Sequence, residues 1–467
     1  MNPFQLPALT RRHLLRSTAC GFGALALHDL AHAATATNPL AVKPAPLQPK
    51  AKRVIFLFMG GGPSQMDLFD PKDYIDRMHG QTIESPLRKE VTQIGTEKFL
   101  ALKAMAPVKP RGQSGMMISD LMPHLASVAD DLCLLRGMSA DNPQHAGATL
   151  QFHTGTFAEV RPSMGAWVSY GLGTENRNLP SFMVLAPAAP YAGAQTWGSD
   201  FLPACHQGTH VIPGKEPLPN LHPNASSIEH QQKELNLLQN LNRLHLRSRA
   251  DDAALDARIR SFETAFGMQK EAPEAFDLSS ESDATLALYG LTRGATTGFG
   301  WQCLVARRLA ERGVRFLELI DVGSSANWDS HGNMMDHERL AKNIDRPIAG
   351  LLADLKQRGM LERTLVVWTT EFGRTPFNQK ADHKGREHHN LCFTSWMAGG
   401  GVKGGHVFGE SDEHGVMASR DRVHTNDLHA TILHLLGINH ERLTFRHSGR
   451  DFRLTDVAGR VVSDIIS

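Results

Sequence analysis

The sequence is poor in cysteine, in net charge and in long apolar runs. Only five of its 467 residues are cysteine and no two form a C-x-x-C pair, which argues against a zinc ribbon and a disulfide-built scaffold. The 49 basic and 48 acidic residues give a formal charge of +1, so the chain lacks the concentrated basic face that nucleic acid binding needs. No apolar stretch is long enough for a stable membrane span. What remains is one large globular chain that can bury a sizeable core.

The N-terminus is typical of an export signal. Arg11 and Arg12 form a twin-arginine pattern, residues 17–30 are weakly hydrophobic, and the Ala-His-Ala at 31–33 fits a cleavage site. We expect residues 1–33 to be removed as a twin-arginine signal peptide, with the twin-arginine translocon as the partner during export. The mature protein is then periplasmic or secreted.

Three continuous apolar runs predict the centre of the fold. Residues 54–59, 314–320 and 364–370 are typical of strands buried on both faces of a parallel sheet. Helical periodicity fills the intervals, and apolar residues between 340 and 355 recur at spacings of three and four. This alternation predicts an α/β sandwich with a mostly parallel sheet.

The remaining segments are assigned to one domain. Residues 34–50 are rich in proline and alanine and are expected to form a flexible leader. Residues 51–467 then make a single domain. From about 225 to 312 the pattern changes to long helices, which we interpret as a helical insertion that shapes substrate access.

Polar side chains follow each of the predicted strands. Ser64 and Asp67 come after the first strand, Asp329 and His331 after the second, and Glu371 directly after the third. In open α/β sheets, ligands bind beyond the carboxyl ends of the strands, where these loops converge. The residues are therefore candidates for one common site.

Carboxylates and imidazoles in this arrangement predict a divalent metal site. Asp329 and His331 are two residues apart, so an extended backbone points both to the same side. Glu371 would add a second carboxylate, and of His388 and His389 one would be a ligand and the other would support it. The donor set leaves zinc, manganese, iron or calcium as the ion.

Such an ion polarises an ester oxygen or lowers the pKa of bound water. Arg374 follows the third strand and is expected to grip a tetrahedral anion with its fork of donors. Each residue alone also has an ordinary structural explanation, because Asp329 could cap a helix and Glu371 could pair with Arg374. The combination of carboxylates and histidines at several strand ends favours the metal site.

Five segments in order resemble a known family. They are RVIFLFMGGGPSQMDLFDPK, NWDSHGN, TLVVWTTEFGRTPFNQ, GREHHN and AGGGVKGGHVFGESDEHG. Together they are similar to the exported bacterial family DUF1501, over nearly the whole mature chain. That family is grouped with the alkaline phosphatase and sulfatase superfamily. The resemblance therefore implies an alkaline-phosphatase-like three-layer α/β/α sandwich and a metal site that cleaves phosphate or sulfate esters.

The resemblance extends to individual residues. Asp67 is similar in place to the first-strand metal aspartate of the superfamily, although it lies several residues later. Asp329 and His331 resemble the central ligands, and His388 resembles the late histidine ligand. Glu371 stands where the superfamily often has Asp-His-Gly, so the carboxylate is kept but the next residue, a phenylalanine, cannot bind metal.

The nucleophile stays open. The chain has no G-x-S-x-G elbow and no sulfatase formylglycine motif around any Cys or Ser. The helix expected from His145 to Gly155 resembles the nucleophile helix of the superfamily, with His145 at the nucleophile position. Thr149, Ser64 and a metal-bound hydroxide are the alternatives.

Two functions from different classes follow. The first is an exported metal-dependent hydrolase of phosphate or sulfate esters, acting on a small-molecule or glycan ester. The alternative is a non-catalytic metal- or ligand-binding member of the same superfamily, suggested by the missing nucleophile. A third possibility is an exported structural protein whose histidines lie on its surface.

The export signal gives the first prediction. Replacing Arg11 and Arg12 together with lysine is expected to leave uncleaved precursor inside the cell, because twin-arginine export depends on that pair. Fractionation followed by immunoblotting measures the effect, and normal export of the double variant would contradict it. Replacing Arg16 alone with lysine is the control and is expected to leave export intact.

Overall fold

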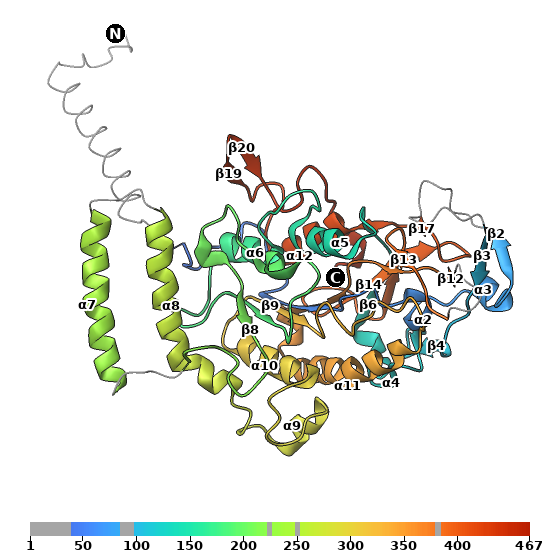
Figure 1. Ribbon diagram of the computed structural model, residues 1–467, viewed down its shortest axis with the longest axis horizontal. Helices are drawn as coiled ribbons and strands as arrows, with labels where there is room; N and C mark the ends of the chain where they lie inside the picture. Colours follow the sequence, from blue (N-terminus) through green and yellow to red (C-terminus); the bar gives the residue numbers. More distant parts are fainter. Residues whose placement is uncertain (1–38, 85–97, 222–226, 248–252, 379–383) are drawn as a thin grey trace, which may run out of the picture.

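The computed structural model describes residues 39–84, 98–221, 227–247, 253–378 and 384–467 (Figure 1). The predicted signal peptide at 1–33 lies outside the described residues. From residue 39 onward the backbone of the predicted leader forms hydrogen bonds with the rest of the domain. Lys43 N–H donates to Leu172 O at 3.0 Å, and Leu47 N–H donates to Gly437 O at 2.8 Å.

A nine-stranded sheet forms the centre of the described chain. Its strands run side by side in the order β15 (His406–Phe408), β6 (Leu132–Ser139), β14 (Phe393–Ala398), β10 (Thr364–Thr369), β1 (Arg53–Phe58), β9 (Phe316–Ile320), β7 (Phe182–Leu185) and β8 (Thr209–Val211), with β18 (Val423–His424) also paired to β6. Within it only β14 pairs antiparallel with its neighbours β6 and β10. The three strands predicted from sequence are confirmed as the adjacent parallel strands β10, β1 and β9.

The alternation of side chains along β1 divides the core in two. Ile55 and Leu57 belong to one fully buried cluster, and Val54, Phe56 and Phe58 belong to the other. Successive side chains of a strand point to opposite faces, and here both faces are covered. This is why the strand reads as a continuous apolar run rather than an alternating one.

Helices cover both faces of the sheet (Figure 1). On one face lie α4 (Pro123–Ala126), α10 (Phe299–Glu311) and α11 (Asp336–Gln357), and on the other lie α5 (His145–Thr154), α6 (Met164–Leu172) and α12 (Thr425–Leu435). Leu340, Ile344 and Leu351 of α11 are fully buried in the first cluster, as their helical spacing predicted. The three-layer α/β/α sandwich with a mostly parallel sheet is thus confirmed.

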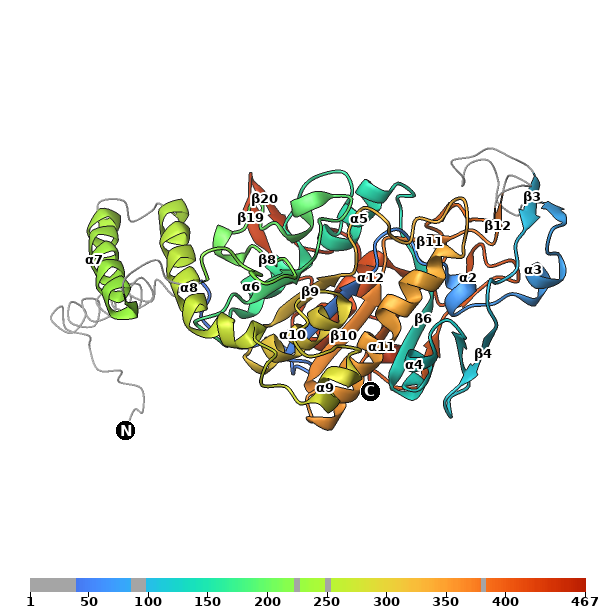
Figure 2. The same cartoon turned by 60° about the horizontal axis from the view of Figure 1, so that its bottom comes forward.

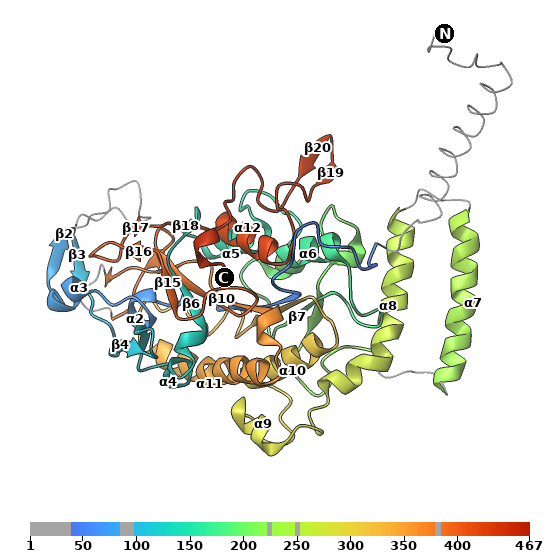
Figure 3. The same ribbon diagram turned by 180° about the vertical axis from the view of Figure 1, so that it is seen from behind.

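The helical segment expected from 225 to 312 divides into two parts. The first part is a long antiparallel hairpin of α7 (Ile228–Arg247) and α8 (Ala253–Phe276) that projects from one end of the molecule in all three views (Figures 1, 2 and 3). The second part, α9 (Asp283–Leu288) and α10, packs against α11 in the helical layer. Figure 1 shows the hairpin away from α5 and β13 (His388–His389), and Figure 2 also shows it away from α5.

Short elements complete the described chain. They are α2 (Gln65–Leu68), α3 (Asp73–Arg77), β2 (Thr82–Glu84), β3 (Lys98–Ala101), β4 (Val108–Arg111), β5 (Met116–Ser119), β11 (Gly373–Arg374), β12 (Phe377–Asn378), β16 (Glu410–Ser411), β17 (Ala418–Arg420), β19 (Phe445–His447) and β20 (Arg450–Phe452). Among the described residues, no helix is long and apolar enough to cross a bilayer.

The two-sided core gives a stability prediction. Leu57 is fully buried in the middle of β1, so Leu57→Ala is expected to lower the free energy of unfolding by about 2–5 kcal/mol through lost burial and a residual cavity. Val457→Ala is the matched control, because Val457 is 86% exposed and such surface changes stay within about 0.5 kcal/mol. Urea denaturation of both variants measures the difference. Equal losses would show that β1 is not central to the core.

Candidate metal centre

The predicted site residues come from loops at one edge of the sheet. Strands β1, β9 and β10 are parallel, so their carboxyl ends meet at the same edge. Asp329 and His331 follow β9, and Glu371 follows β10. His388 lies in the short strand β13, whose partner β11 continues from β10. His145 is the first residue of α5, which follows β6, and β6 runs in the same direction as β10 because both pair antiparallel with β14.

The carboxylate of Asp329 is the centre of this group. Its Oδ2 lies 3.2 Å from His145 Nε2. Its Oδ1 lies 2.9 Å from His331 Nε2 and 3.3 Å from His388 Nε2, and it also accepts a bond of 2.6 Å from Arg374 Nη2. Asp329, His331 and His388 are thus brought together as the sequence predicted, and His145 joins them.

Each of the three histidines is fixed by its other ring nitrogen. The Nδ1–H of His145 donates to Glu371 Oε1 at 2.7 Å, and that of His331 donates to Glu387 Oε2 at 2.7 Å. The Nδ1–H of His388 donates to the carbonyl oxygen of Pro143 at 2.9 Å. In a neutral imidazole the second nitrogen then carries a lone pair, so all three Nε2 atoms present acceptors to the acceptor oxygens of Asp329.

Acceptors that face one another need a positive charge between them. His331 Nε2 and His388 Nε2 are only 3.0 Å apart, a distance that two lone pairs do not hold without a shared proton or cation. One donor atom from each of His145, Asp329 and His388 lies within 4.8 Å of the others. Metal-ligating histidines usually donate their second N–H to a carboxylate or a backbone carbonyl, and all three rings do so. The residues therefore fit a divalent cation.

The hydrogen bonds of the cluster also shift the pKa values of its aspartate and histidines. Burial raises the pKa of Asp329, but its bonds to His145, His331 and His388 outweigh burial and hold that pKa well below its ordinary value. The bonds to Asp329 and Glu387 raise the pKa of His331 to about 9. Burial alone would lower the pKa of His145, yet its bonds to Asp329 and Glu371 raise it. Without a metal ion the cluster thus holds protons in the cation's place.

Glu371 lies behind His145 rather than among the converging atoms. It is fully buried. Its Oε1 accepts the Gly61 N–H at 2.8 Å as well as the imidazole N–H, and its Oε2 accepts the Thr370 hydroxyl at 3.0 Å. In this structure Glu371 orients His145, while the sequence had placed it as a ligand.

Arg374 is fully buried and bound to the protein. Its Nε–H donates to Gly62 O at 2.9 Å, Nη1 donates to Arg386 O at 3.1 Å, and Nη2 donates to Gly61 O as well as to Asp329. The guanidinium therefore fixes Asp329 and the loop after β1. These four bonds use four of its five N–H groups and the side chain is fully buried, so it cannot present the two-pronged grip on a substrate anion that was expected from sequence without giving up a bond.

Two glycines allow the loops to approach this closely. A Cβ on Gly61, which has φ +108°, would lie 2.7 Å from the backbone nitrogen of Asp329. A Cβ on Gly385 would lie 2.0 Å from the carbonyl oxygen of His331. The glycine run after β1 and the glycine of GREHHN thus let backbone pack directly on the Asp329 loop.

Asp67 and Ser64 occupy a neighbouring network. Asp67 is fully buried, and its Oδ2 accepts a 2.8 Å bond from Arg386 Nε while its Oδ1 accepts the N–H of Met105. The Ser64 N–H donates to His337 Nε2 at 3.1 Å. In this structure Asp67 is the partner of Arg386, a residue that the sequence analysis did not single out, and its charge is balanced there.

The two other predicted residues also lie outside the converging group. His389 is buried and donates its Nε2–H to Val416 O at 2.7 Å, so it packs on the far side of β13 from His388. Thr149 is fully buried one turn into α5, and its hydroxyl has no hydrogen-bond partner among the described residues.

Two contributors were missed from sequence. Tyr191 stacks on His145 with ring centroids 4.0 Å apart, and its hydroxyl accepts a 3.0 Å bond from Asn327. It comes from a proline- and glycine-rich loop that carries no helical or strand pattern. Glu387 supports His331, and its position beside His388 in GREHHN was the available signal. Phe372 packs on both His145 and His388, with its ring centroid 4.8 Å and 4.5 Å from theirs.

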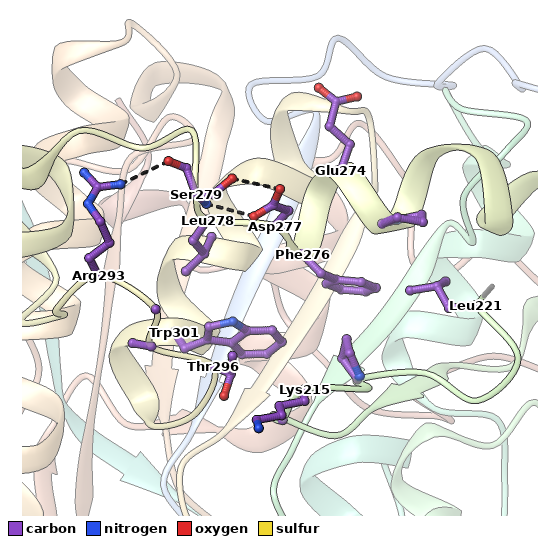
Figure 4. Close-up of a pocket in the computed structure, with 15 residues that line it drawn as sticks. Lys215, Leu221, Glu274, Phe276, Asp277, Leu278, Ser279, Arg293, Thr296 and Trp301 are labelled. Carbon is purple, nitrogen blue, oxygen red and sulfur yellow. Dashed lines mark hydrogen bonds between the residues drawn. The ribbon is translucent and has the colours of Figure 1, made fainter.

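A cavity of about 690 Å³ lies elsewhere, between the end of α8 and the start of α10 (Figure 4). Phe276, Leu278 and Trp301 form its apolar wall, and Lys215 and Arg293 stand beside it. None of the predicted site residues lines this cavity.

The fold and the cluster define an α/β/α protein with a histidine and aspartate centre at the carboxyl edge of its sheet. The chain belongs to the family described as "Protein of unknown function (DUF1501)", whose model matches residues 51–466. The resemblance seen in the sequence is thereby confirmed. A search of curated proteins finds no match.

Solved structures give a looser likeness. The chain is 10% identical to the lipoteichoic acid synthase LtaP from Listeria monocytogenes, covering 90% of this chain and 80% of that one with a TM-score of 0.37. The chain is 13% identical to the PsFucS1 sulfatase from Pseudoalteromonas sp., covering 84% of this chain and 68% of that one with a TM-score of 0.34. It is 11% identical to the alkaline phosphatase from the Antarctic bacterium TAB5, covering 83% of this chain and 98% of that one with a TM-score of 0.30. These scores carry no conclusion about function.

A buried acid supports the loop that carries Asp329. Asp321 directly follows β9, is 4% exposed, and accepts a 2.7 Å bond from the indole N–H of Trp328. Burial raises the pKa of Asp321 to about 7. Because the folded state holds this proton more tightly than the unfolded chain, this group reduces stability as the pH rises from about 4 to about 7.

Asp321→Asn is expected to remove that pH-dependent loss. The amide oxygen still accepts the Trp328 N–H, so at pH 8 the variant should be more stable than wild type by on the order of 2 kcal/mol, with no gain at pH 4. Thermal or urea unfolding at both pH values measures this. A gain of the same size at pH 4 would show that the titration of Asp321 is not its cause.

Proposed function

We propose that this protein is an exported, metal-dependent hydrolase of phosphate or sulfate esters. The single observation that supports the metal site best is the convergence of three Nε2 lone pairs on the Asp329 carboxylate, each ring held by a fixed Nδ1–H bond. The family resemblance supports the ester substrate class. The twin-arginine pattern supports export to the periplasm or the exterior.

The proposed ligands are His145, Asp329 and His388, joined by His331 at the exposed side. His331 is 40% exposed, so a ligand reaching the centre from solvent meets this ring. Three imidazoles with one carboxylate suit zinc, manganese or iron. Calcium, which prefers six to eight oxygen ligands, suits this set less well.

When bound, a divalent cation here polarises an ester oxygen and acidifies water. The chain's own residues prepare the site for it. Glu371 and Glu387 fix the tautomers of His145 and His331, and Arg374 holds Asp329 in place. Phe372 and Tyr191 pack against the ring of His145 and shield that ring from water.

Water is the nucleophile that we favour. Ser64 and Thr149 are both fully buried, and His145 is engaged at Nδ1 by Glu371. A side chain that attacks a substrate must be reachable by it.

The second candidate function is metal-dependent binding without turnover. It is favoured by the same burial of Ser64 and Thr149, which leaves no accessible hydroxyl nucleophile from these two residues. This protein would bind metal and an anionic ligand but release no product.

Metal content and turnover test the proposal together. Asp329→Asn and His145→Ala are expected to lose the bound metal and to reduce hydrolysis of aryl phosphate, phosphodiester or aryl sulfate roughly 10²-fold or more, because each removes a donor to the ion. Glu371→Gln is expected to weaken metal affinity by about 10–100-fold, since it supports a ligand rather than being one. Elemental analysis and chelator titration measure the metal.

His124→Ala is the control, because His124 is an exposed histidine on α4 outside the cluster. It should leave metal content and rate unchanged. Bound metal in the wild type with no turnover on any of the three esters would support the binding function instead. Wild-type protein that takes up no metal would remove both functions.

A further inference from the structure

A buried glutamate stands in the middle of β9. Glu318 is 1% exposed, and its neighbours in the sheet are Phe56 of β1 and Val184 of β7. Phe316, two residues earlier on the same face of the strand, belongs to the apolar cluster that covers this side of the sheet. A carboxylate in such surroundings is costly unless it is paired and hydrogen-bonded.

His153 of α5 is the partner of Glu318. Its Nε2–H donates to Glu318 Oε1 at 2.7 Å, and its Nδ1–H donates to the carbonyl oxygen of Thr149 at 2.7 Å. Both partners are acceptors, so the ring carries two protons and forms an ion pair with the carboxylate. Burial lowers the pKa of His153, but the charge and the hydrogen bond of Glu318 outweigh burial and raise it. The contact is therefore a charge-assisted hydrogen bond, which is short and strong.

Aromatic rings enclose this ion pair. The ring of His153 packs edge-on against Phe58 and Phe56, with centroids 4.6 Å and 6.0 Å apart. His153 is only 3% exposed, so water does not compete for its bonds. The bond from His153 thus connects α5 directly to a strand of the sheet.

The other contacts of α5 constrain its rotation on the sheet less. Of its ten described residues, only Phe152 belongs to the apolar cluster on this face, and apolar contacts are non-directional. Gln151 and the carbonyl oxygen of Phe152 are bonded to Asp141 and His429, which lie in the preceding loop and in α12 and not in the sheet.

The position of His145 depends on this rotation. His145, Thr149 and His153 recur every four residues, so they lie along one side of α5. A side-chain tip lies about 5–6 Å from a helix axis, so a rotation of about 20° moves it by about 2 Å. His145 Nε2 lies 3.2 Å from Asp329 Oδ2, and such a displacement would break that contact.

We infer that the ion pair of His153 and Glu318 positions the proposed metal centre, because it holds α5 on β9 at the rotation that presents His145 to Asp329. This role rests on the proposed function, since it concerns the geometry of the same centre. His153 and Glu318 are positioning residues, and all of their action passes through His145. A pair that served stability alone would be replaceable, because apolar residues of similar size often stabilise a protein as well as a buried ion pair does.

The double variant His153→Phe/Glu318→Leu separates positioning from stability. Its apolar side chains fill the space beside Phe56 and Phe58 without a buried charge, so the urea midpoint of the mature chain is expected to equal or exceed that of wild type. Its affinity for Zn²⁺, measured by competition with a chelating dye, is expected to fall about 10-fold or more, as for other groups that orient a metal ligand.

Two single variants are the matched controls. Glu318→Gln keeps the connection, because the amide N–H donates to Nε2 of a neutral His153 while Nδ1–H still donates to Thr149 O. Its zinc affinity is expected to stay close to that of wild type. Phe152→Leu removes apolar contact from α5 but keeps the ion pair, so it should lower the urea midpoint and leave zinc affinity unchanged.

A measurement without metal distinguishes failure of this inference from failure of the metal site. In proton NMR of the metal-free wild type, the Nδ1–H of His145 that is bonded to Glu371 should give a downfield, slowly exchanging signal, assigned by its loss in His145→Ala. The signal should persist in Glu318→Gln and disappear in the double variant. If it does so in a wild type that takes up no zinc, the metal site fails and the positioning of His145 stands.

The opposite results would overturn the inference. A folded double variant that keeps both the His145 signal and wild-type zinc affinity shows that the ion pair positions nothing. A loss of affinity that Phe152→Leu shares in proportion to its lost stability leads to the same conclusion. If the double variant does not fold, Glu318→Leu alone gives the test, because His153 stays bonded to Thr149 O and loses only its connection to β9.

Discussion

The geometry of the histidine and aspartate cluster depends on which groups accept the Nδ1–H of His145, His331 and His388. Each Nδ1–H is given to an acceptor that the fold has already fixed, namely Glu371, Glu387 and the carbonyl of Pro143. In the neutral rings the opposite nitrogens then carry lone pairs, and they converge on a carboxylate that is also an acceptor. The site therefore has more lone pairs than hydrogen-bond donors, and a positive charge between the side chains would satisfy those lone pairs. In the proposed metal site, the bonds that support the ligands would contribute to metal affinity as much as the ligands do.

Hydrogen-bond donors from the surrounding loops explain why a buried carboxylate is tolerated beside this cluster. Glu371 is fully buried, and a buried carboxylate is costly unless every lone pair finds a donor. Here the backbone of Gly61, the hydroxyl of Thr370 and His145 supply those donors. Arg374 brings the matching positive charge to Asp329 and bonds to the loop carbonyls as well. The arrangement needs glycine in the loop after β1, since a side chain at position 61 would collide with the backbone of Asp329.

Hydrophobic pattern predicted the framework of this site well. The apolar runs located β1, β9 and β10, and the rule that loops meet at the carboxyl edge of a parallel sheet brought Asp329, His331 and Glu371 to one place. The rule could not decide which of them touch each other. Spacing gives the edge on which a residue stands, but the direction of its side chain depends on partners that are distant in sequence. Asp67 turns to Arg386, 319 residues away, and Glu371 turns to His145, 226 residues away.

The helical hairpin shows the same limit from the opposite direction. The leucines of α7 recur with helical period, and period alone assigns them to the core. In the structure Leu237, Leu241 and Leu244 are exposed, whereas Leu235 and Leu246 are partly buried on the side where Gln231 and Gln239 join α7 to α8. Helical period therefore identifies which residues share a face, but it does not say which face the neighbouring helix covers. The hairpin lies at the end of the molecule away from α5 (Figures 1 and 2), so the direction of its side chains has no bearing on the edge of the sheet where the cluster lies.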